Sequence, residues 1–572
     1  MKFRRTWDER TGEETLKVPL SGSELLQNPL FNKGLGFTEE ERRELKLEGL
    51  LPPRVVTLEQ DVALAYEQYQ QASTDVGRYV FLARLQNRNE ALYARLLFEH
   101  IAEMTPIVYT PVVGTAVERH AHIWRDARGV FLTPAQKDRI EAILTGVSNR
   151  DHVEAIVVTD AEAILGIGDQ GAGGMAIAVG KLALYTLCGG IRPEATLPVM
   201  LDVGTDNQER LDDPVYFGWR HPRIRGQAYD DFLEAFVTAV MKVFPRALLQ
   251  FEDFGTLNAR DLLERYRHRL CTFNDDIQGT GVVTVGSLIA AAQITRTKLS
   301  EHDVVILGGG NAGTGIADQI VAKAVDEGVP AEQARSKIWF VGRYGLMLSN
   351  MEEPKFPYRK KYYQPVERVK DWKRAAQEEV SLADVIRNVH PSILIGSAAR
   401  PGAFSEEMIR EMAAHVERPI IFALSNPTDK AEAVPADLFR WTGGRVLTAT
   451  GSPFPDVQYE GHSYRISQCN NSFVFPGVVL GALSSGAKRI SNSMLMAAAT
   501  GLAQCSPAHK DPTAPLLPSL EQVREVSRAV ALAVAAQAQR EDLAEKTTPE
   551  ELERKVAAKM WTPCYPRVRL LR

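Results

Sequence analysis

The sequence predicts an α/β protein, with a mainly helical N-terminal region followed by two domains in which strands and helices alternate. Helical patterns dominate the first 130 or so residues, alternation begins near residue 150, and a second alternating series begins near residue 280. Such alternation is typical of parallel sheets whose strands are joined by helices. The chain has 572 residues, which is enough for several domains with cores of their own.

The N-terminal region, residues 1–130, is predicted to contain helices that are polar on one face. Thr38 is followed three residues later by Glu41, a pairing that predicts a capping box at the start of the first helix. Two longer helices are expected over residues 57–72 and 80–102.

The first alternating domain is expected over residues 131–276. Its short apolar runs predict strands over residues 155–159, 163–165 and 197–202, and a helix over residues 180–187.

The second alternating domain is expected over residues 277–538, with a late alanine-rich helix over residues 526–538. Its strands are predicted over residues 304–307, 338–341, 393–395 and 420–424. Residues 539–572 are expected to form a C-terminal tail, with a helix followed by an extended arm.

Composition predicts a cytoplasmic protein that binds neither nucleic acid nor membrane. The formal charge of -5 offers no electrostatic footprint for nucleic acid. The five cysteines include no CxxC pair, which fits a reducing compartment and argues against a zinc site of the CxxC type. The N-terminus lacks the apolar run of a signal peptide, and no uninterrupted apolar run reaches the length of about 18 residues that a membrane span needs.

Two blocks of acids lie roughly twenty residues apart, Glu252-Asp253 and Asp275-Asp276, and each adjoins phenylalanine. Adjacent carboxylates are costly to bury unless positive charge compensates them. Mg²⁺ and Mn²⁺ prefer carboxylate oxygens and are the simplest compensation. The pattern favours a metal held by Glu252, Asp253 and Asp276, and ordinary solvated surface acids are the alternative.

The pattern G-x-G-x-x-G occurs at residues 166–171 and 308–313, and only the second copy follows a predicted strand and opens a predicted helix. There Gly308 suits a tight turn, Gly310 the approach of a pyrophosphate, and Gly313 the packing of helix on strand. Free N–H groups at the helix N-terminus bind phosphates. The sequence therefore predicts a Rossmann-type dinucleotide-binding domain. The residues expected to contact the dinucleotide in this loop are Gly308, Gly310, Asn311, Ala312 and Gly313.

The end of the next strand bears on the choice between NAD and NADP. An NAD enzyme carries an acid there to bind the ribose hydroxyls, whereas this chain has Gly342 followed by Arg343. Loss of the acid removes repulsion toward a 2′-phosphate, and Arg343 could pair with that phosphate. The sequence favours NADP over NAD as cofactor, unless Arg343 is only a solvated loop residue.

Lys181 lies in an apolar helical segment, directly after Gly180. Two interpretations fit it equally. Either its ammonium reaches the surface along an apolar stem, or it is desolvated and acts as a base.

Six segments, in order along the chain, resemble those of malic enzymes. They are residues 106–114 (PIVYTPVVG), 164–181, 251–254 (FEDF), 273–280 (FNDDIQGT), 424–428 (LSNPT) and 468–477 (QCNNSFVFPG). The resemblance implies oxidative decarboxylation of (S)-malate to pyruvate and CO₂ with NADP or NAD and Mn²⁺ or Mg²⁺, in a homo-oligomer that is a tetramer or dimer.

The resemblance also implies roles for individual residues. Glu252, Asp253 and Asp276 would bind the metal. Lys181 would be the general base, supported by Asp275, and Tyr109 would donate a proton to C3 of enolpyruvate. The residues implied to bind substrate are Asn426, Asn470 and Asn471, of which Asn426 would also contact the cofactor.

One departure from the family concerns Ala161 and Ala163, which stand where most malic enzymes have the Gly and Arg of a Gly-Glu-Arg triplet. The missing Arg is expected to grip a malate carboxylate and contact the cofactor. Two alternatives therefore stay open: a malolactic enzyme that converts malate to lactate and CO₂ with bound NAD, and a non-catalytic sensor of malate or cofactor.

Overall fold

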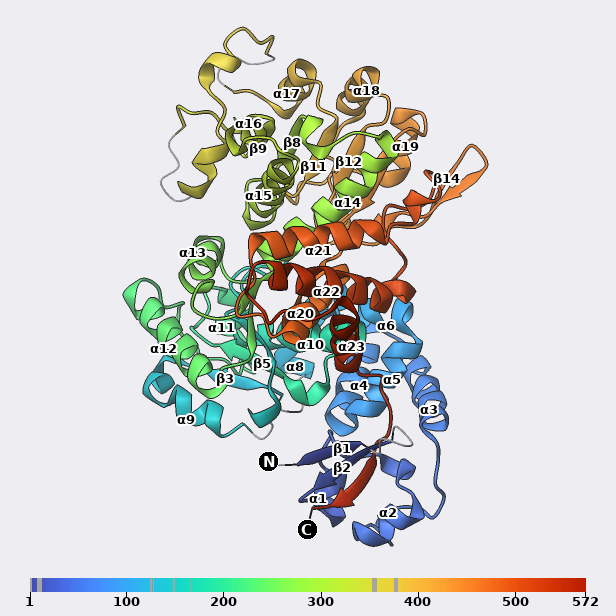
Figure 1. The fold of residues 1–572 in the computed structure, drawn as a ribbon. Helices are drawn as coiled ribbons and strands as arrows, with labels where there is room; N and C mark the ends of the chain where they lie inside the picture. Colours follow the sequence, from blue (N-terminus) through green and yellow to red (C-terminus); the bar gives the residue numbers. More distant parts are fainter. Residues whose placement is uncertain are drawn as a thin grey trace. The chain divides into compact units, whose positions relative to one another are not determined.

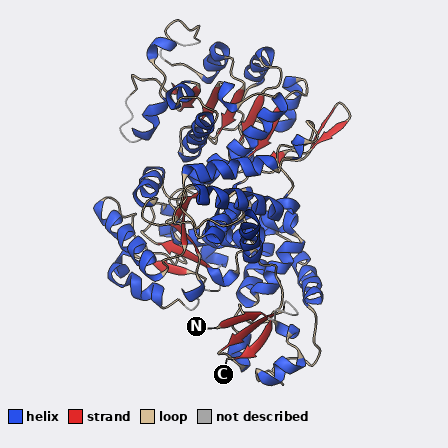
Figure 2. Ribbon diagram, viewed as in Figure 1, coloured by secondary structure: helices blue, strands red, loops and turns tan. Residues whose placement is uncertain are grey.

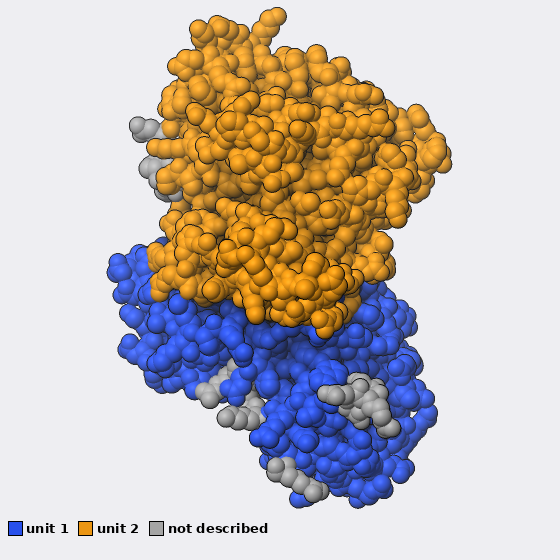
Figure 3. All heavy atoms as spheres, in the orientation of Figure 1, with its two compact units in different colours: residues 1–252, 558–572 blue, residues 253–557 orange. Residues whose placement is uncertain are grey.

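A computed structural model describes residues 3–7, 13–123, 126, 128–147, 150–164, 166–351, 357–374 and 379–571 of the protein. The chain divides into two compact units, residues 1–252 with 558–572 and residues 253–557 (Figure 3). Both units contain parallel strands connected by helices, so the predicted α/β class is confirmed (Figures 1 and 2).

The two ends of the chain share a small sheet in the first unit. Strands β1 (Arg4–Trp7) and β2 (Glu14–Val18) pair antiparallel, and β17 (Arg567–Leu570) pairs parallel with β2 (Figure 1). The extended arm expected in the tail is β17. The hairpin was not predicted, because β1 is largely exposed and carries two arginines in four residues, which hides any alternation of apolar and polar side chains.

The N-terminal helices follow the prediction except at one point. Helix α2 (Glu39–Glu44) starts with the predicted capping box at Thr38, and α3 (Leu58–Gln70) forms as expected. The prediction of a single helix over residues 80–102 is wrong. This part of the chain is divided among α4 (Asp75–Arg88), α5 (Glu90–Glu99) and α6 (Ile101–Val108).

Asn89 causes the first of these breaks. It ends α4 in an extended conformation with φ −154°, and its side-chain oxygen accepts the N–H of Leu92 at 3.0 Å to cap α5. Asparagine favours helix caps over helix interiors because its side chain competes for nearby backbone groups.

The first unit is built around parallel strands in the order β3-β5-β4-β6. They are β3 (Val130–Leu132), β4 (Ala155–Thr159), β5 (Thr196–Leu201) and β6 (Leu248–Glu252). Every residue of β4, β5 and β6 is buried, as in parallel sheets covered by helices. The prediction of a strand over residues 163–165 is wrong, because Ile164 forms only an isolated bridge to Gly168. Leu165 lies outside the described residues.

Helix α10 (Met175–Gly189) is a core element of this unit. The segments Gly171–Gly189 and Asp275–Thr295 are long and apolar enough to cross a membrane. Within the fold, however, 94% of the apolar window in the first segment is buried, and 83% of that in the second. That degree of burial is typical of core helices in globular domains.

The second unit contains a sheet in the order β10-β9-β8-β11-β12-β13-β16, parallel except for β10. Its strands are β8 (Val304–Leu307), β9 (Ile338–Gly342), β10 (Gly345–Leu346), β11 (Ile393–Gly396), β12 (Ile420–Ala423), β13 (Leu447–Thr450) and β16 (Ser467–Gln468). Helices flank this sheet on both faces (Figure 2). Strand order reverses between β8 and β11, which marks the position where open α/β sheets bind ligands.

The helices of the second unit connect these strands or follow them. They include α13 (Thr256–Tyr266), α14 (Thr280–Thr295), α15 (Asn311–Asp326), α16 (Ala331–Ser336), α17 (Leu382–Val389), α18 (Glu406–His415), α19 (Pro435–Thr442), α20 (Phe475–Ser485), α21 (Asn492–Gln504) and α22 (Val523–Arg540). The predicted alanine-rich helix is α22, and the helix expected in the tail is α23 (Pro549–Lys559).

Gly180 allows α6 and α10 to approach closely in the first unit. A Cβ at this position would lie 2.7 Å from the carbonyl oxygen of Val108, the last residue of α6. Tyr109 follows Val108 and Lys181 follows Gly180, so this contact brings the two predicted catalytic side chains together.

We expect Gly180→Ala to lower the free energy of unfolding by about 1–3 kcal/mol, because the added methyl meets backbone that has to move. Urea denaturation measures the effect. The matched control is Gly114→Ala in α7 (Val112–Glu118), where a Cβ would meet nothing within 4 Å. It should be neutral or slightly stabilising, since alanine is the better helix former. Equal effects of the two substitutions would contradict the packing role of Gly180.

Candidate active site

Lys181 is buried at the centre of the first unit's polar core, with 1% of its surface exposed. Its Nζ lies 2.8 Å from Glu252 Oε1 and 5.2 Å from the centre of the Tyr109 ring. Lys181 and Glu252 come from α10 and from the end of β6, and Tyr109 caps α6. The surface-reaching interpretation of Lys181 is therefore wrong, and its ammonium is desolvated beside a carboxylate and an aromatic ring.

Two residues outside the predicted site set support Glu252. Gln250 Nε2 donates to Glu252 Oε2 at 2.6 Å, and the Tyr185 hydroxyl donates to Gln250 Oε1. Gln250 is two residues from Glu252 along β6, and Tyr185 is four residues from Lys181 along α10. Side chains at these spacings share a face of a strand and of a helix, so this signal was present in the sequence.

Glu252, Asp253 and Asp276 offer carboxylate oxygens that lie within 4.8 Å of one another. Glu252 and Asp253 are consecutive residues, and the N–H of Asp253 donates to Asp276 Oδ2 at 2.8 Å. Asp253 adopts φ +57°, a left-handed conformation that is uncommon outside glycine and is often found at functional sites. Three clustered carboxylates form a donor set that suits Mg²⁺ or Mn²⁺, so the residues present fit the predicted metal.

Asp275 is buried at the start of a short helical turn, Asp275–Gly279, in the second unit. The side-chain amide of Asn471 donates to Asp275 Oδ2 at 3.0 Å and to the Asp275 carbonyl oxygen at 3.2 Å. Asn470 instead caps the next turn, because its side-chain oxygen accepts the N–H of Ser472 at 2.9 Å. Asn471 thus fixes the position of Asp275, and Asn470 shapes the loop that carries Asn471.

The glycine loop lines a cleft of about 720 Å³ within the second unit. Gly308 adopts φ +114°, and a Cβ there would lie 2.6 Å from the carbonyl oxygen of Ser397, the residue after β11. A Cβ on Gly313 would overlap the carbonyl oxygen of Gly308, whereas a Cβ on Gly310 would meet nothing within 4 Å. The turn and the helix–strand packing therefore require glycine at 308 and 313, and open space adjoins Gly310.

Asn311 and Ala312 form the first turn of α15, as expected for the residues that present N–H groups to phosphate. Arg343 is exposed, lines the same cleft and lies with its guanidinium 5.7 Å from the Tyr344 ring centre. Arg359 also lines the cleft, and a Cβ on Gly309 would lie 3.6 Å from its Nε.

Asn426 follows β12, and its Oδ1 accepts the hydroxyl of Ser452 at 2.5 Å. Its side chain is therefore oriented by a neighbouring loop. The structure describes all fifteen predicted site residues. In the first unit it brings together Tyr109, Lys181 and Glu252, and in the second unit it brings together Asp275 and Asn471.

The loop that carries Ala163 is held by a buried arginine. Arg223 donates to both carboxylate oxygens of Asp169 at 2.8 Å and to the carbonyl oxygen of Asp160 at 2.7 Å. Burial raises the pKa of Asp160 to about 6, although the nearby Arg223 opposes that shift. Ala161 in this loop adopts φ +55°, a conformation that favours the glycine most malic enzymes have there.

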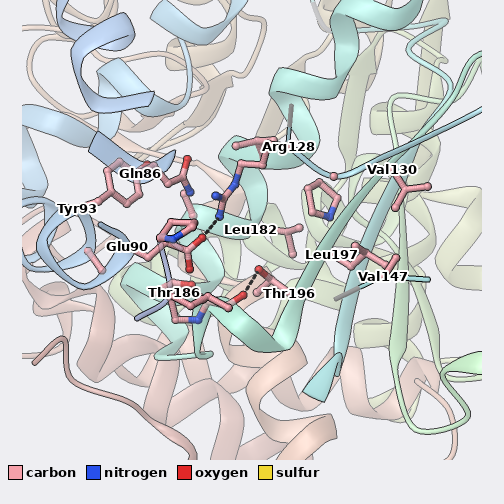
Figure 4. Close-up of a pocket in the computed structure, with 18 of the residues that line it drawn as sticks. Gln86, Glu90, Tyr93, Arg128, Val130, Val147, Leu182, Thr186, Thr196 and Leu197 are labelled. Atoms are coloured by element: carbon pink, nitrogen blue, oxygen red, sulfur yellow. Dashed lines mark hydrogen bonds and ion pairs between the residues drawn. The ribbon is translucent and has the colours of Figure 1, made fainter. Parts of the chain in front are cut away.

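A separate cavity of about 340 Å³ adjoins α10 in the first unit (Figure 4). Its polar wall is an ion pair in which Arg128 donates to Glu90 Oε1 at 2.6 Å, and Leu182 and Thr186 of α10 contribute to its lining. Burial raises the pKa of Glu90, opposed by Arg128. Neither Lys181 nor the carboxylate cluster lines this cavity, so it is distinct from the candidate active site.

We expect Lys181→Met to lower the free energy of unfolding by about 3–5 kcal/mol without divalent metal, because buried Glu252 would lose its ionic partner. Added Mn²⁺ should restore part of the loss. Urea denaturation with and without Mn²⁺ measures both effects. The control is Lys242→Met, which removes an exposed pair with Glu141 and should cost no more than about 1 kcal/mol with no response to Mn²⁺. Equal losses in the two variants would contradict the role of the buried pair.

Comparison with known proteins gives matches over nearly the whole chain. The family described as malic enzyme, N-terminal domain, matches residues 86–267, and the family described as malic enzyme, NAD binding domain, matches residues 277–539. The NAD-dependent malic enzyme of Aliivibrio fischeri is 49% identical over 552 residues, which is 96% of this chain and 98% of the relative. The NAD-dependent malic enzyme of Shewanella loihica is 51% identical over 552 residues, which is also 96% of this chain and 98% of the relative.

Solved structures share the fold at lower sequence identity. The malic enzyme from Pyrococcus horikoshii has a TM-score of 0.54 and 22% identity, with coverage of 80% of this chain and 89% of that one. The Entamoeba histolytica malic enzyme has a TM-score of 0.54 and 20% identity, with coverage of 92% of each chain. Because both family domains are present and about half of the residues are identical to those of relatives of nearly equal length, this chain is an enzyme of the malic enzyme family.

Proposed function

We propose that this enzyme oxidises (S)-malate and decarboxylates it to pyruvate and CO₂, with hydride transfer to a nicotinamide dinucleotide. The observation that carries the proposal is the buried Lys181 side chain, whose Nζ contacts Glu252 and lies near the Tyr109 ring. A desolvated amine beside a proton-bearing phenol provides the base and the acid that the reaction needs. The names of the bacterial relatives, NAD-dependent malic enzyme, support the same reaction.

Lys181 and Tyr109 carry the proton transfers in this proposal. The unprotonated Lys181 amine would take the proton from the C2 hydroxyl of malate, and the bound dinucleotide would accept the hydride from C2. Decarboxylation then gives enolpyruvate, and Tyr109 returns a proton to its C3. The 5.2 Å between Lys181 Nζ and the Tyr109 ring centre supports a shared pocket, and proton transfer from Lys181 to Tyr109 would restore both groups.

Glu252, Asp253 and Asp276 would hold Mn²⁺ or Mg²⁺. Such an ion supplies Lewis-acid polarisation of substrate oxygens and stabilises developing negative charge. Asp275, held in place by Asn471, is proposed to support the charge state of Lys181. Asn426 is proposed to bind substrate and cofactor, with Asn470 and Asn471 also on the substrate side. We further propose a cytoplasmic homo-oligomer, a tetramer or dimer, on the basis of the family resemblance.

We expect purified enzyme with malate, Mn²⁺ and cofactor to form reduced nicotinamide and pyruvate in equal amounts, measured by absorbance and by product analysis. Lys181→Ala should lower kcat about 10²–10⁴-fold, because a positioned acid–base group contributes that much. Tyr109→Phe should do the same, whereas Tyr66→Phe, which removes an exposed hydroxyl bonded to Glu103, should leave kcat unchanged.

Two outcomes would overturn the proposal. Lactate formed without net cofactor reduction would identify a malolactic enzyme, which the loss of the family arginine at Ala163 makes the main rival. Binding of malate and cofactor without any turnover would identify a sensor.

For cofactor choice we propose that the enzyme accepts NADP at least as well as NAD. Gly342 offers no carboxylate to repel a 2′-phosphate, and Arg343 and Arg359 both line the cleft. The relatives' names point to NAD for those proteins. This chain would therefore differ from them in its choice of cofactor.

We expect Gly342→Asp to lower kcat/KM for NADP about tenfold or more, equivalent to at least about 1.4 kcal/mol, with little loss for NAD. Arg359→Gln should also weaken NADP selectively. Its matched control is Lys360→Gln, an exposed neighbour outside the cleft lining. A strong NAD preference in the parent enzyme, unchanged by Arg359→Gln, would refute the assignment.

A further inference from the structure

The described part of the chain contains a second group of potential metal ligands, apart from the acids at Glu252. It consists of His390, Glu411 and His415, whose ligand atoms all lie within 4.8 Å of one another. None of the three belongs to the candidate active site or lines the dinucleotide cleft. We propose that these residues form a separate site for Zn²⁺ or a similar imidazole-preferring divalent ion, which clips α17 to α18.

Two neighbouring helix ends create the group. His390 is the residue directly after α17, and Glu411 and His415 lie one turn apart at the end of α18. Helices α17 and α18 are neighbours in the second unit (Figure 1). A spacing of four residues places Glu411 and His415 on one face of the helix, and His415 Nε2 lies 3.3 Å from Glu411 Oε1. The rings of His390 and His415 are 3.7 Å apart between centres, so all three side chains converge.

The helices beneath these side chains are fixed, while the side chains themselves can adjust. Val385 and Ile386 of α17 belong to the same buried core cluster as Ile409 and Met412 of α18. His390 and His415 are exposed, so their rings can rotate to the distance of about 2.0–2.1 Å from Zn²⁺ that imidazole nitrogen requires. The shared core thus positions the two helix ends, and the exposed side chains converge there.

The local electrostatics favour a cation here. Glu411 contributes a negative charge, and α17 ends at this place, where its dipole is negative, whereas Arg445 already compensates the negative end of α18. Arg445 already binds the carbonyl oxygens of Ala413 and Glu417, each at 2.8 Å. An ion would therefore be bound by the three side chains rather than by the last carbonyls of α18.

Ligand chemistry separates this site from the acid cluster. Two imidazoles and one carboxylate suit Zn²⁺, Ni²⁺ or Cu²⁺, whereas three carboxylates suit Mg²⁺ or Mn²⁺. Three protein ligands on an exposed surface leave the fourth position to water. His390 is followed by two residues and then by β11, a central strand of the dinucleotide-binding sheet. A bound ion would therefore hold the start of this strand in position.

The test is a calorimetric titration of the full-length enzyme with Zn²⁺, in millimolar Mg²⁺ to occupy the acid cluster, at about pH 7.5, where imidazole is ordinarily neutral. The parent protein should bind one Zn²⁺ that His415→Gln and His390→Asn each weaken at least about tenfold. Asparagine tolerates the left-handed conformation of His390, φ +52°, so this variant should fold. Zn²⁺ should also raise the unfolding temperature of the parent and of neither variant.

The matched control is His462→Ala, which removes an exposed histidine elsewhere in the same unit and should leave Zn²⁺ binding unchanged. The proposal fails if the parent binds no Zn²⁺ under these conditions, or if both histidine variants bind it as well as the parent does. Turnover of malate with Mn²⁺ should be unaffected by His415→Gln. The outcome is therefore independent of the proposed reaction.

Discussion

The buried contact between Lys181 Nζ and Glu252 Oε1, at 2.8 Å, is the interaction around which the candidate active-site residues of the first unit are arranged. Removing an ammonium and a carboxylate from water costs several kcal/mol per ion, so such a pair persists only with good geometry and additional hydrogen bonds. Gln250 supplies one such bond to Glu252, and Tyr185 supports Gln250. Gly180 then allows Tyr109 to approach the same lysine.

The pair also compensates the buried charge of Glu252. Glu252 has a cationic partner within its own unit, while Asp253 and Asp276 share a hydrogen bond through the Asp253 N–H. That arrangement leaves a compact set of carboxylate oxygens of the kind that suits a divalent ion.

Features encoded by neighbouring residues were predictable from the sequence. The glycine loop was recognised because β8, the turn at Gly308 and helix α15 are consecutive, and the capping box at Thr38 is equally local. The site residues were predicted through their resemblance to a family, whereas their contacts with Gln250 and Tyr185 were missed.

Other features depend on contacts between distant parts of the chain and could not be predicted from short stretches of sequence. The sheet formed by β1, β2 and β17 joins the two ends of the sequence, and no short-range pattern records such pairing. The strand expected over residues 163–165 failed because three apolar residues suit a strand or a buried loop equally. In the protein that loop is held by Arg223 through Asp169 and the Asp160 carbonyl instead of by a ladder of strands.

The most direct test of the central claim is equilibrium binding of Mn²⁺, measured from the electron paramagnetic resonance signal of the free ion. We expect Glu252→Gln, Asp253→Asn and Asp276→Asn each to weaken binding about tenfold or more, since each removes a ligand charge from one cluster. Asp261→Asn, at an exposed acid on α13, should bind Mn²⁺ like the parent. Unchanged binding in the three cluster variants would contradict the assignment of these acids as the metal site.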